Sequence, residues 1–99
     1  MKSSGDVPQL FPAIITIIAG SGGDDSEDFA RMLATMYRRY AERKGFATYE
    51  IDRHETSHDG YKNVVLEVAD TQAYSLLRNE TGVHRLVRIS PFNLSLIHI

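Results

Sequence analysis

The stretch Glu80-Thr-Gly-Val-His-Arg-Leu-Val-Arg-Ile-Ser-Pro-Phe92 combines the signals of a turn, a strand and a strand end. Thr81-Gly82 predicts a tight turn, because glycine adopts backbone conformations that a Cβ atom forbids. Pro91 is expected to end the strand that follows, since it has no N–H group to donate to a neighbouring strand. The segment Ser90-Pro91-Phe92 should then present a hydroxyl, a rigid ring and an aromatic face at an exposed tip.

The strand itself is predicted over residues 83–89 by an imperfect alternation of apolar and polar side chains. The two faces consist of Val83, Val87 and Ile89 on one side and His84 and Arg88 on the other. We expect the apolar face to pack against a core.

The first half of the chain predicts a strand and a long helix. Residues 13–19 are almost continuously apolar, which favours a strand covered on both faces. The glycine-rich residues 20–23 lead into the helix, with Asp24 as the expected cap and Glu27 completing a capping box. Gly45 is the expected C-terminal stop. The expected buried stripe has helical spacing and consists of Phe29, Met32, Leu33, Met36, Tyr37, Tyr40 and Ala41.

Two further strands are predicted at residues 46–53 and 62–69, joined as a hairpin by the Asp59-Gly60 turn. Their alternating apolar positions are Ala47, Tyr49 and Ile51 in the first strand and Val64, Leu66 and Val68 in the second. A short helix follows residues 70–72, with Tyr74 half-buried and with Ala73, Leu76 and Leu77 facing inward. The predicted fold class is therefore α+β, a two-layer sandwich of β-α-β-β-α-β order with both helices on one face of a mixed sheet.

Length and composition fit one small globular domain, because the chain has 99 residues of which 42% are hydrophobic. It has no cysteine, which excludes disulfides and cysteine-ligated zinc. The longest apolar run is too short to span a membrane and no secretory leader opens the chain, so we expect a cytoplasmic protein. The net charge of −2 means that any contact with RNA has to be local.

Two segments resemble the codon-recognition domain of bacterial-type class I peptide chain release factors. Residues 80–88 followed by Ser90-Pro91-Phe92 are similar to the branch that carries a Ser-Pro-Phe tripeptide and reads UAA and UGA. Ala19-Gly20-Ser21-Gly22-Gly23 is similar to that family's turn into its long central helix. The resemblance covers about residues 14–93. It implies translation termination, with the small-subunit decoding centre of the ribosome and the mRNA stop codon as partners.

The resemblance also implies roles for individual residues. Ser90 is placed in the family to hydrogen-bond the purine at the second codon position, and a hydroxyl that both donates and accepts meets either adenine or guanine. The helix tip meets the first uridine, where the family commonly carries Glu at the position of Asp25. The expected stop-codon contacts are Ser90, Pro91, Phe92, Gly22 and Asp25, and the expected supporting or RNA-contacting residues are His84, Arg85 and Arg88.

A basic cluster at the end of the long helix is a second candidate for RNA contact, although charges at a helix end are more often simply solvated. The cluster consists of Arg38, Arg39, Arg43 and Lys44.

Three regions are expected: a flexible leader at residues 1–12, a partial codon-recognition domain at residues 13–93 and a non-matching tail at residues 94–99. Gly22-Gly23 is followed by Asp24, so it is not the family's hydrolytic Gly-Gly-Gln motif. We therefore expect no catalysis by these residues, and no cofactor, metal, membrane or small-molecule substrate.

Two alternative functions remain open. A different small α+β RNA-binding module would need exposed aromatic side chains on a sheet face, for which Tyr49 and Tyr61 are the candidates. His54-Glu55-Thr56-Ser57-His58 matches the H-E-x-x-H pattern of zinc hydrolases, which requires a helix. In an extended segment the two histidines would lie about 13 Å apart, too far to share one zinc ion. The glycine-rich turn does not favour phosphate binding, because it lacks a Walker lysine and is followed by acidic residues.

Overall fold

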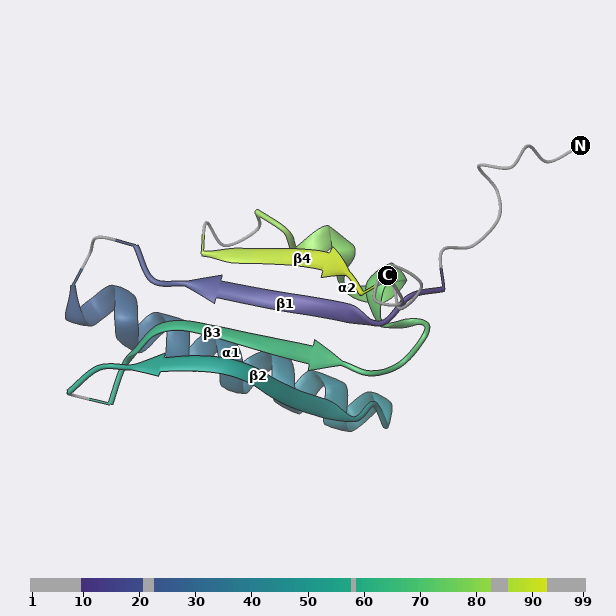
Figure 1. Ribbon diagram of the computed structural model, residues 1–99, viewed down its shortest axis with the longest axis horizontal. Helices are drawn as coiled ribbons and strands as arrows, with labels where there is room; N and C mark the ends of the chain where they lie inside the picture. Colours follow the sequence, from purple (N-terminus) through teal and green to yellow (C-terminus); the bar gives the residue numbers. More distant parts are fainter. Residues whose placement is uncertain (1–9, 21–22, 58, 83–85, 93–99) are drawn as a thin grey trace, which may run out of the picture.

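The computed structural model describes residues 10–20, 23–57, 59–82 and 86–92, and Figure 1 shows how the elements are arranged. The elements follow in the predicted order, with a short 3₁₀ helix before the last strand. They are β1 (Ala13–Ile18), α1 (Asp24–Lys44), β2 (Thr48–Glu55), β3 (Tyr61–Val68), α2 (Ala73–Leu77), the 3₁₀ helix η2 (Arg78–Glu80) and β4 (Val87–Pro91).

The four strands form one antiparallel sheet in the order β2-β3-β1-β4, so the prediction of a mixed sheet is wrong. The connection through α1 makes β2 parallel to β1, but β3 folds back from β2 and lies between the two. In the same way, the connection through α2 makes β4 parallel to β3, with β1 between them. Parallel strands therefore exist in this sheet but are never neighbours.

One face of the sheet is covered by both helices, as predicted, and a single apolar core joins the two layers. Ile15 and Ile17 of β1 have no exposed surface, whereas Ile18 is 55% exposed. The apolar run of β1 predicts burial on both faces, but among the described residues β1 is covered only on its helix side. Ile15 lies opposite Leu66 of β3 and Ile89 of β4, so the core continues across three strands.

The buried stripe of α1 differs from the predicted one by a rotation of the helix. Leu33, Tyr37 and Ala41 are buried as predicted, but Met32 and Met36 are 58% and 40% exposed. Phe29 is also exposed. Their places against the sheet are taken by Ala30 and Ala34, which are fully or almost fully buried. Alanine lets the helix axis approach the strands closely, so the small residues face the sheet and the methionines lie outside.

Two predictions concern the ends of α1, namely a cap at Asp24 and a stop at Gly45. Asp24 is the first residue of the helix and Gly23 occupies the cap position, so the predicted cap at Asp24 is wrong. Gly45 ends the helix as predicted, in the left-handed conformation with φ 79°. The Gly45 and Phe46 amides donate to the carbonyls of Glu42 and Ala41, at 3.0 and 2.8 Å, which is the Schellman arrangement. Phe46 then packs against the core.

The hairpin of β2 and β3 is confirmed, but β2 is more exposed than its sequence predicts. Tyr49 and Ile51 are 57% and 54% exposed, because β2 is an edge strand whose register against β3 shifts at two irregularities. The positions of β3 predicted to be buried, Val64, Leu66 and Val68, are buried.

The short helix α2 is confirmed with one difference. Ala73 and Leu77 are buried and Tyr74 is half-buried, as predicted, but Leu76 is 43% exposed. The helix has only five residues, so it turns a narrow face inward. Asp70 supports its start, because its carboxylate accepts the Gln72 amide at 2.9 Å.

Candidate functional site

The last strand, β4, carries the predicted Ser90-Pro91-Phe92 segment at one end of the sheet. Ser90 lies opposite Ile14 and Pro91 lies opposite Ala13 at the beginning of β1. The strand ends at Pro91, as its missing N–H predicts, and the Phe92 amide donates to the Pro12 carbonyl at 2.8 Å. The strand begins at Val87, after Leu86 in a turn, and Ser90 and Pro91 belong to it, while residues 83–85 of the predicted strand lie outside the described residues. The segment is therefore part of the paired sheet and not a free tip.

The turn before β4 holds this strand from its outer side. Gly82 has a left-handed φ of 80°, as the predicted tight turn requires, and its amide donates to the Val87 carbonyl at 3.2 Å. The Thr81 hydroxyl accepts the Ile89 amide at 2.7 Å and donates to the Ile89 carbonyl at 3.3 Å. Ile89 is thus fixed by β1 on one side and by Thr81 on the other. The sequence signalled the turn but not this hydroxyl contact.

The alternation along β4 places Ser90 on the face of the sheet that the helices leave open. Val87 and Ile89 are buried on the helix side, as predicted, while Arg88 is exposed on the opposite side. A shallow hollow of about 410 Å³ lies at this place, lined by Thr16, Ile18, Leu86, Val87, Arg88 and Ser90. It offers two hydroxyls and one guanidinium beside an apolar floor, which suits a polar ligand with a flat apolar part.

The start of α1 carries the other predicted contact, Asp25, which is exposed in the first helical turn. The Ser26 hydroxyl accepts the Gly20 amide at 2.8 Å, which ties the turn to the end of β1. Glu27 is 7% exposed, and its carboxylate lies 3.6 Å from the Lys62 ammonium of β3. Gly60, in the turn between β2 and β3, packs directly against Glu27.

The two predicted contact regions lie at opposite ends of β1, as Figure 1 shows. Ser90 pairs with Ile14, whereas α1 begins beyond Ile18 at the other end of the strand. At about 3.3 Å per residue, the four steps from Ile14 to Ile18 already span about 13 Å. One small molecule cannot touch both regions, but an extended polymer can.

Three of the predicted site residues, Gly22, His84 and Arg85, lie outside the described residues.

A hydrogen bond joins α1 to the 3₁₀ helix η2. Glu80 of η2 accepts it from the Tyr37 hydroxyl of α1 at 2.9 Å. Burial raises the pKa of Tyr37 well above its ordinary value, and the hydrogen bond and negative charge of Glu80 raise this pKa further. The pair joins the middle of α1 to the turn that holds β4.

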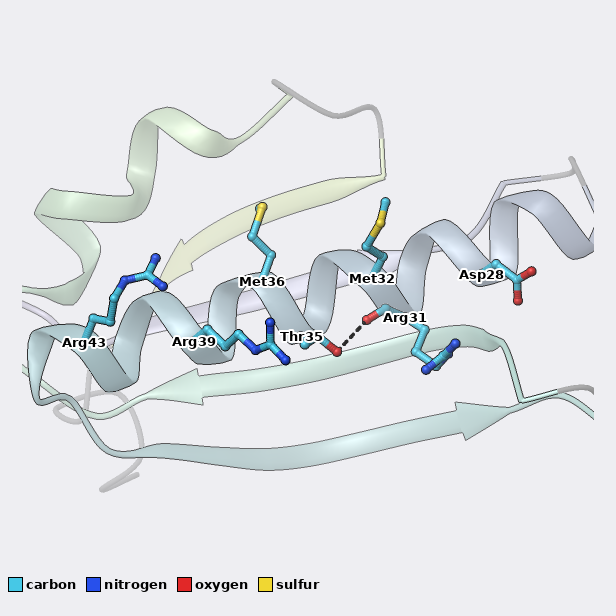
Figure 2. Close-up of a pocket in the computed structure, with 7 residues that line it drawn as sticks. All are labelled: Asp28, Arg31, Met32, Thr35, Met36, Arg39 and Arg43. Atoms are coloured by element: carbon cyan, nitrogen blue, oxygen red, sulfur yellow. Dashed lines mark hydrogen bonds between the residues drawn. The ribbon is translucent and has the colours of Figure 1, made fainter.

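The outer face of α1 carries exposed methionines beside arginines, a combination that the sequence analysis did not predict. Figure 2 shows Met32 and Met36 pointing the same way from the helix, with arginine side chains around them. This face forms an open hollow of about 640 Å³, lined by Asp28, Arg31, Met32, Thr35, Met36, Arg39 and Arg43. Within the predicted basic cluster, Arg38 is instead ion-paired with Glu50, and the Lys44 ammonium lies 5.7 Å from the centre of the Tyr40 ring.

The alternative functions receive little support. His54 and Glu55 are the last residues of strand β2, so the helix that a zinc hydrolase motif requires is not formed, and His58 lies outside the described residues. In the part of the chain that the structure describes, no group of three acidic or histidine side chains could hold a metal ion. Tyr49 is exposed, but Tyr61 packs against the core and hydrogen-bonds Arg53.

Fold and sheet topology define the class of this protein as a two-layer α+β sandwich built from two interlocked β-α-β units. Comparison with known protein families identifies the family to which the chain belongs. Residues 8–96 match the PCRF domain model, and the chain therefore belongs to the PCRF domain family.

Individual relatives agree with this assignment. The chain is 49% identical over 81 residues to peptide chain release factor 2 of Helicobacter acinonychis, and 47% identical over 81 residues to that of Chloroflexus aggregans. Both matches cover 82% of this chain and 22% of the relative, so the chain spans about a fifth of the length of these proteins. The solved structure of RF2 of Thermus thermophilus superposes with a TM-score of 0.78 at 27% identity, covering 89% of this chain and 30% of that one. Among the described residues, no helix is both long and apolar enough to cross a bilayer.

Proposed function

We propose that this chain acts in translation termination, as the part of a release factor that reads the stop codons UAA and UGA in the decoding centre of the ribosome. The observation that carries the proposal is the match to the PCRF domain over residues 8–96, together with 49% identity to a peptide chain release factor 2. The half-buried hydroxyls of Thr16 and Ser90 and the exposed Arg88 supply chemistry that fits a nucleotide.

In this proposal Ser90 reads the purine at the second codon position, and Pro91 and Phe92 shape the pocket around it. Ser90 is held by backbone pairing with Ile14, so its hydroxyl does not have to support the fold. Because a hydroxyl both donates and accepts, it is compatible with adenine and with guanine. Arg88, exposed beside Ser90, would attract the RNA backbone, and we assign the same supporting role to His84 and Arg85.

The first uridine is assigned to the start of α1, with Gly22 and Asp25 as its contacts. An exposed carboxylate accepts the N3–H donor that uracil presents and cytosine lacks. Aspartate is one methylene shorter than the glutamate common in the family, so the helix tip has to come closer to the base. Asp25 and Ser90 lie beside opposite ends of β1, so each is assigned to a different base.

Ribosomal RNA is the proposed partner of the outer face of α1. Arg31, Arg39 and Arg43 lie along one side of the helix, which gives a local positive charge to a chain of net charge −2. We propose that the chain works in the cytoplasm and that it has no catalytic residue or cofactor of its own. In full-length relatives, peptide release depends on the Gly-Gly-Gln loop, to which nothing in residues 13–93 corresponds.

The proposal is tested by a chimera in which residues 13–93 replace the matching segment of Helicobacter acinonychis peptide chain release factor 2. Peptide release is measured on ribosomes programmed with UAA, UGA or UAG. We expect release on UAA and UGA only, and about a tenfold loss on both with Ser90→Ala, the effect of one hydrogen bond. Ser57→Ala, an exposed serine in the β2–β3 turn, is the matched control and should behave like the parent. A folded, ribosome-bound chimera without release on any stop codon would overturn the proposal.

A further inference from the structure

The turn between β2 and β3 packs against the first turn of α1, although it lies on a different part of the chain. A Cβ atom built on Gly60 would lie 2.7 Å from the Cβ of Glu27 and 3.1 Å from its backbone carbonyl carbon. Real Cβ atoms essentially never approach other atoms at 2.7 Å, so any side chain at residue 60 has to displace the helix start. Only glycine fits at this position without a shift.

Hydrogen bonds join Thr56 to Gly60, the residue that contacts the helix. The Thr56 amide donates to the Gly60 carbonyl at 2.9 Å, and the Gly60 amide donates back to the Thr56 hydroxyl at 3.0 Å. Asp59 adopts a left-handed φ of 67°, which closes the turn. Gly60 is therefore tied to Thr56 of the hairpin where it approaches α1.

Two further contacts hold the same helical turn. Glu27 is buried against the hairpin, with its carboxylate near the Lys62 ammonium, and Ser26 accepts the Gly20 amide. Lys62 also connects to the end of β1, because its carbonyl accepts the Ala19 amide at 2.9 Å. The helix start is thus held by β1, β3 and the hairpin turn at once, while Asp25 between these anchors stays exposed.

We infer that Gly60, Glu27 and Ser26 are positioning residues that set where Asp25 meets the first base of the codon. This inference rests on the proposed function. The three residues do not touch the RNA themselves; they fix the distance between the helix tip and the sheet. Since a misplacement of 1 Å can cost roughly a hundredfold in a positioned interaction, the few tenths of an ångström forced by a new Cβ are expected to cost about tenfold.

The test uses the 99-residue chain, fluorescently labelled, and small ribosomal subunits programmed with UAA or CAA. The readout is the ratio of the two dissociation constants, which does not change if a variant merely lowers the folded fraction. We expect the wild-type chain to prefer UAA and Gly60→Ala to lower the ratio by about tenfold. Gly45→Ala is the matched control, because Gly45 has φ 79° and no atom within 4 Å of an added Cβ. It should destabilise the far end of α1 and leave the ratio unchanged.

A second variant keeps the test decisive if Gly60→Ala does not fold. Ser26→Ala removes the hydroxyl that accepts the Gly20 amide without adding bulk, and Ser26→Thr restores a hydroxyl. We expect the ratio to fall with alanine and to recover with threonine. No UAA preference in the wild-type chain would refute the proposed function, and with it the positioning role. A wild-type preference that Gly60→Ala and Ser26→Ala both retain would refute the positioning role alone.

Discussion

The two ends of β1 hold their candidate contacts by different means. At the end near α1, contacts of side chains fix the helix start. Ser26 accepts a hydrogen bond from Gly20, Glu27 lies near Lys62, and Gly60 packs so closely against Glu27 that no side chain fits at residue 60. At the other end, backbone pairing holds Ser90 opposite Ile14. A contact held by side chains can be moved by one substitution, whereas a contact held by the backbone can change its side chain and keep its place. The comparison therefore predicts where substitutions alter stability and where they alter only recognition.

The largest effect is expected at the close packing of the hairpin turn on α1. Gly60→Val places two methyl groups where even one Cβ meets Glu27, so the free energy of unfolding should fall by about 2–3 kcal/mol. Urea denaturation followed by circular dichroism measures the change. Gly45→Ala is the control and should cost only about 1 kcal/mol, because it suffers from its left-handed φ alone. Equal losses for the two variants would show that the contact with Glu27 is not tight.

The next largest effect is expected at the turn that holds β4. Thr81→Val keeps the shape of the side chain but removes the hydroxyl that bonds both the amide and the carbonyl of Ile89. The loss should be about 1–2 kcal/mol in urea denaturation, because the Ile89 amide loses its partner. Thr81→Ser keeps the hydroxyl and should lose less than half as much. If valine were as stable as threonine, the Thr81 hydroxyl would not contribute to holding β4.

A smaller effect is expected at the link between the two regions, where Tyr37 of α1 donates to Glu80. Tyr37→Phe should cost about 1 kcal/mol at pH 8 by removing this hydrogen bond. Burial and Glu80 raise the folded-state pKa of Tyr37 above the value of about 10 for an unfolded chain. The stabilisation from the neutral phenol is therefore complete below pH 10 and is lost as the pH rises above it.

Urea denaturation of the wild type and of Tyr37→Phe at pH 8 and pH 11 tests whether this stabilisation is lost as the pH rises. The wild type should lose about 1 kcal/mol more than Tyr37→Phe between the two values, because one pH unit above the unfolded-state pKa corresponds to that much free energy. Parallel losses in the two proteins would mean that folding does not raise the pKa of Tyr37.

The smallest effect on stability is expected at Ser90. Ser90→Ala removes a hydroxyl for which the sheet has no need, so the free energy of unfolding should change by less than about 0.5 kcal/mol. In the release-factor chimera the same substitution should still impair release on UAA and UGA. A large loss of stability would show that the hydroxyl serves the fold rather than recognition.

Local signals were sufficient to predict much of this fold. Gly45 was identified as the end of α1 because its role depends on the adjacent helical residues alone. The burial of Val87 and Ile89 followed from alternation within one strand. The order of the elements followed from such signals, and the sheet was misjudged only because the strand order places an antiparallel neighbour between every parallel pair.

The remaining features depend on contacts between distant parts of the chain. The sequence of α1 contains two adjacent apolar stripes with helical spacing, and either could face the sheet. The prediction places the larger Met36 in the buried stripe, but close packing on the sheet favours the smaller Ala34. Gly60 was recognised as a turn residue, but its need to be glycine comes from Glu27 of another element. The residues proposed for codon contact came from the resemblance, since a serine on an open sheet face has no signal of its own.

The most direct test of the account is to find which segment meets which base. In the chimera bound to programmed ribosomes, 4-thiouridine at the first codon position and 6-thioguanosine at the second position of UGA are crosslinked, and the crosslinked peptides are mapped by mass spectrometry. The account predicts that the first base crosslinks to residues 20–28 and the second base to residues 90–92, which lie beside opposite ends of β1. Crosslinks of both bases to one segment, or to the open face around Tyr49, would contradict it.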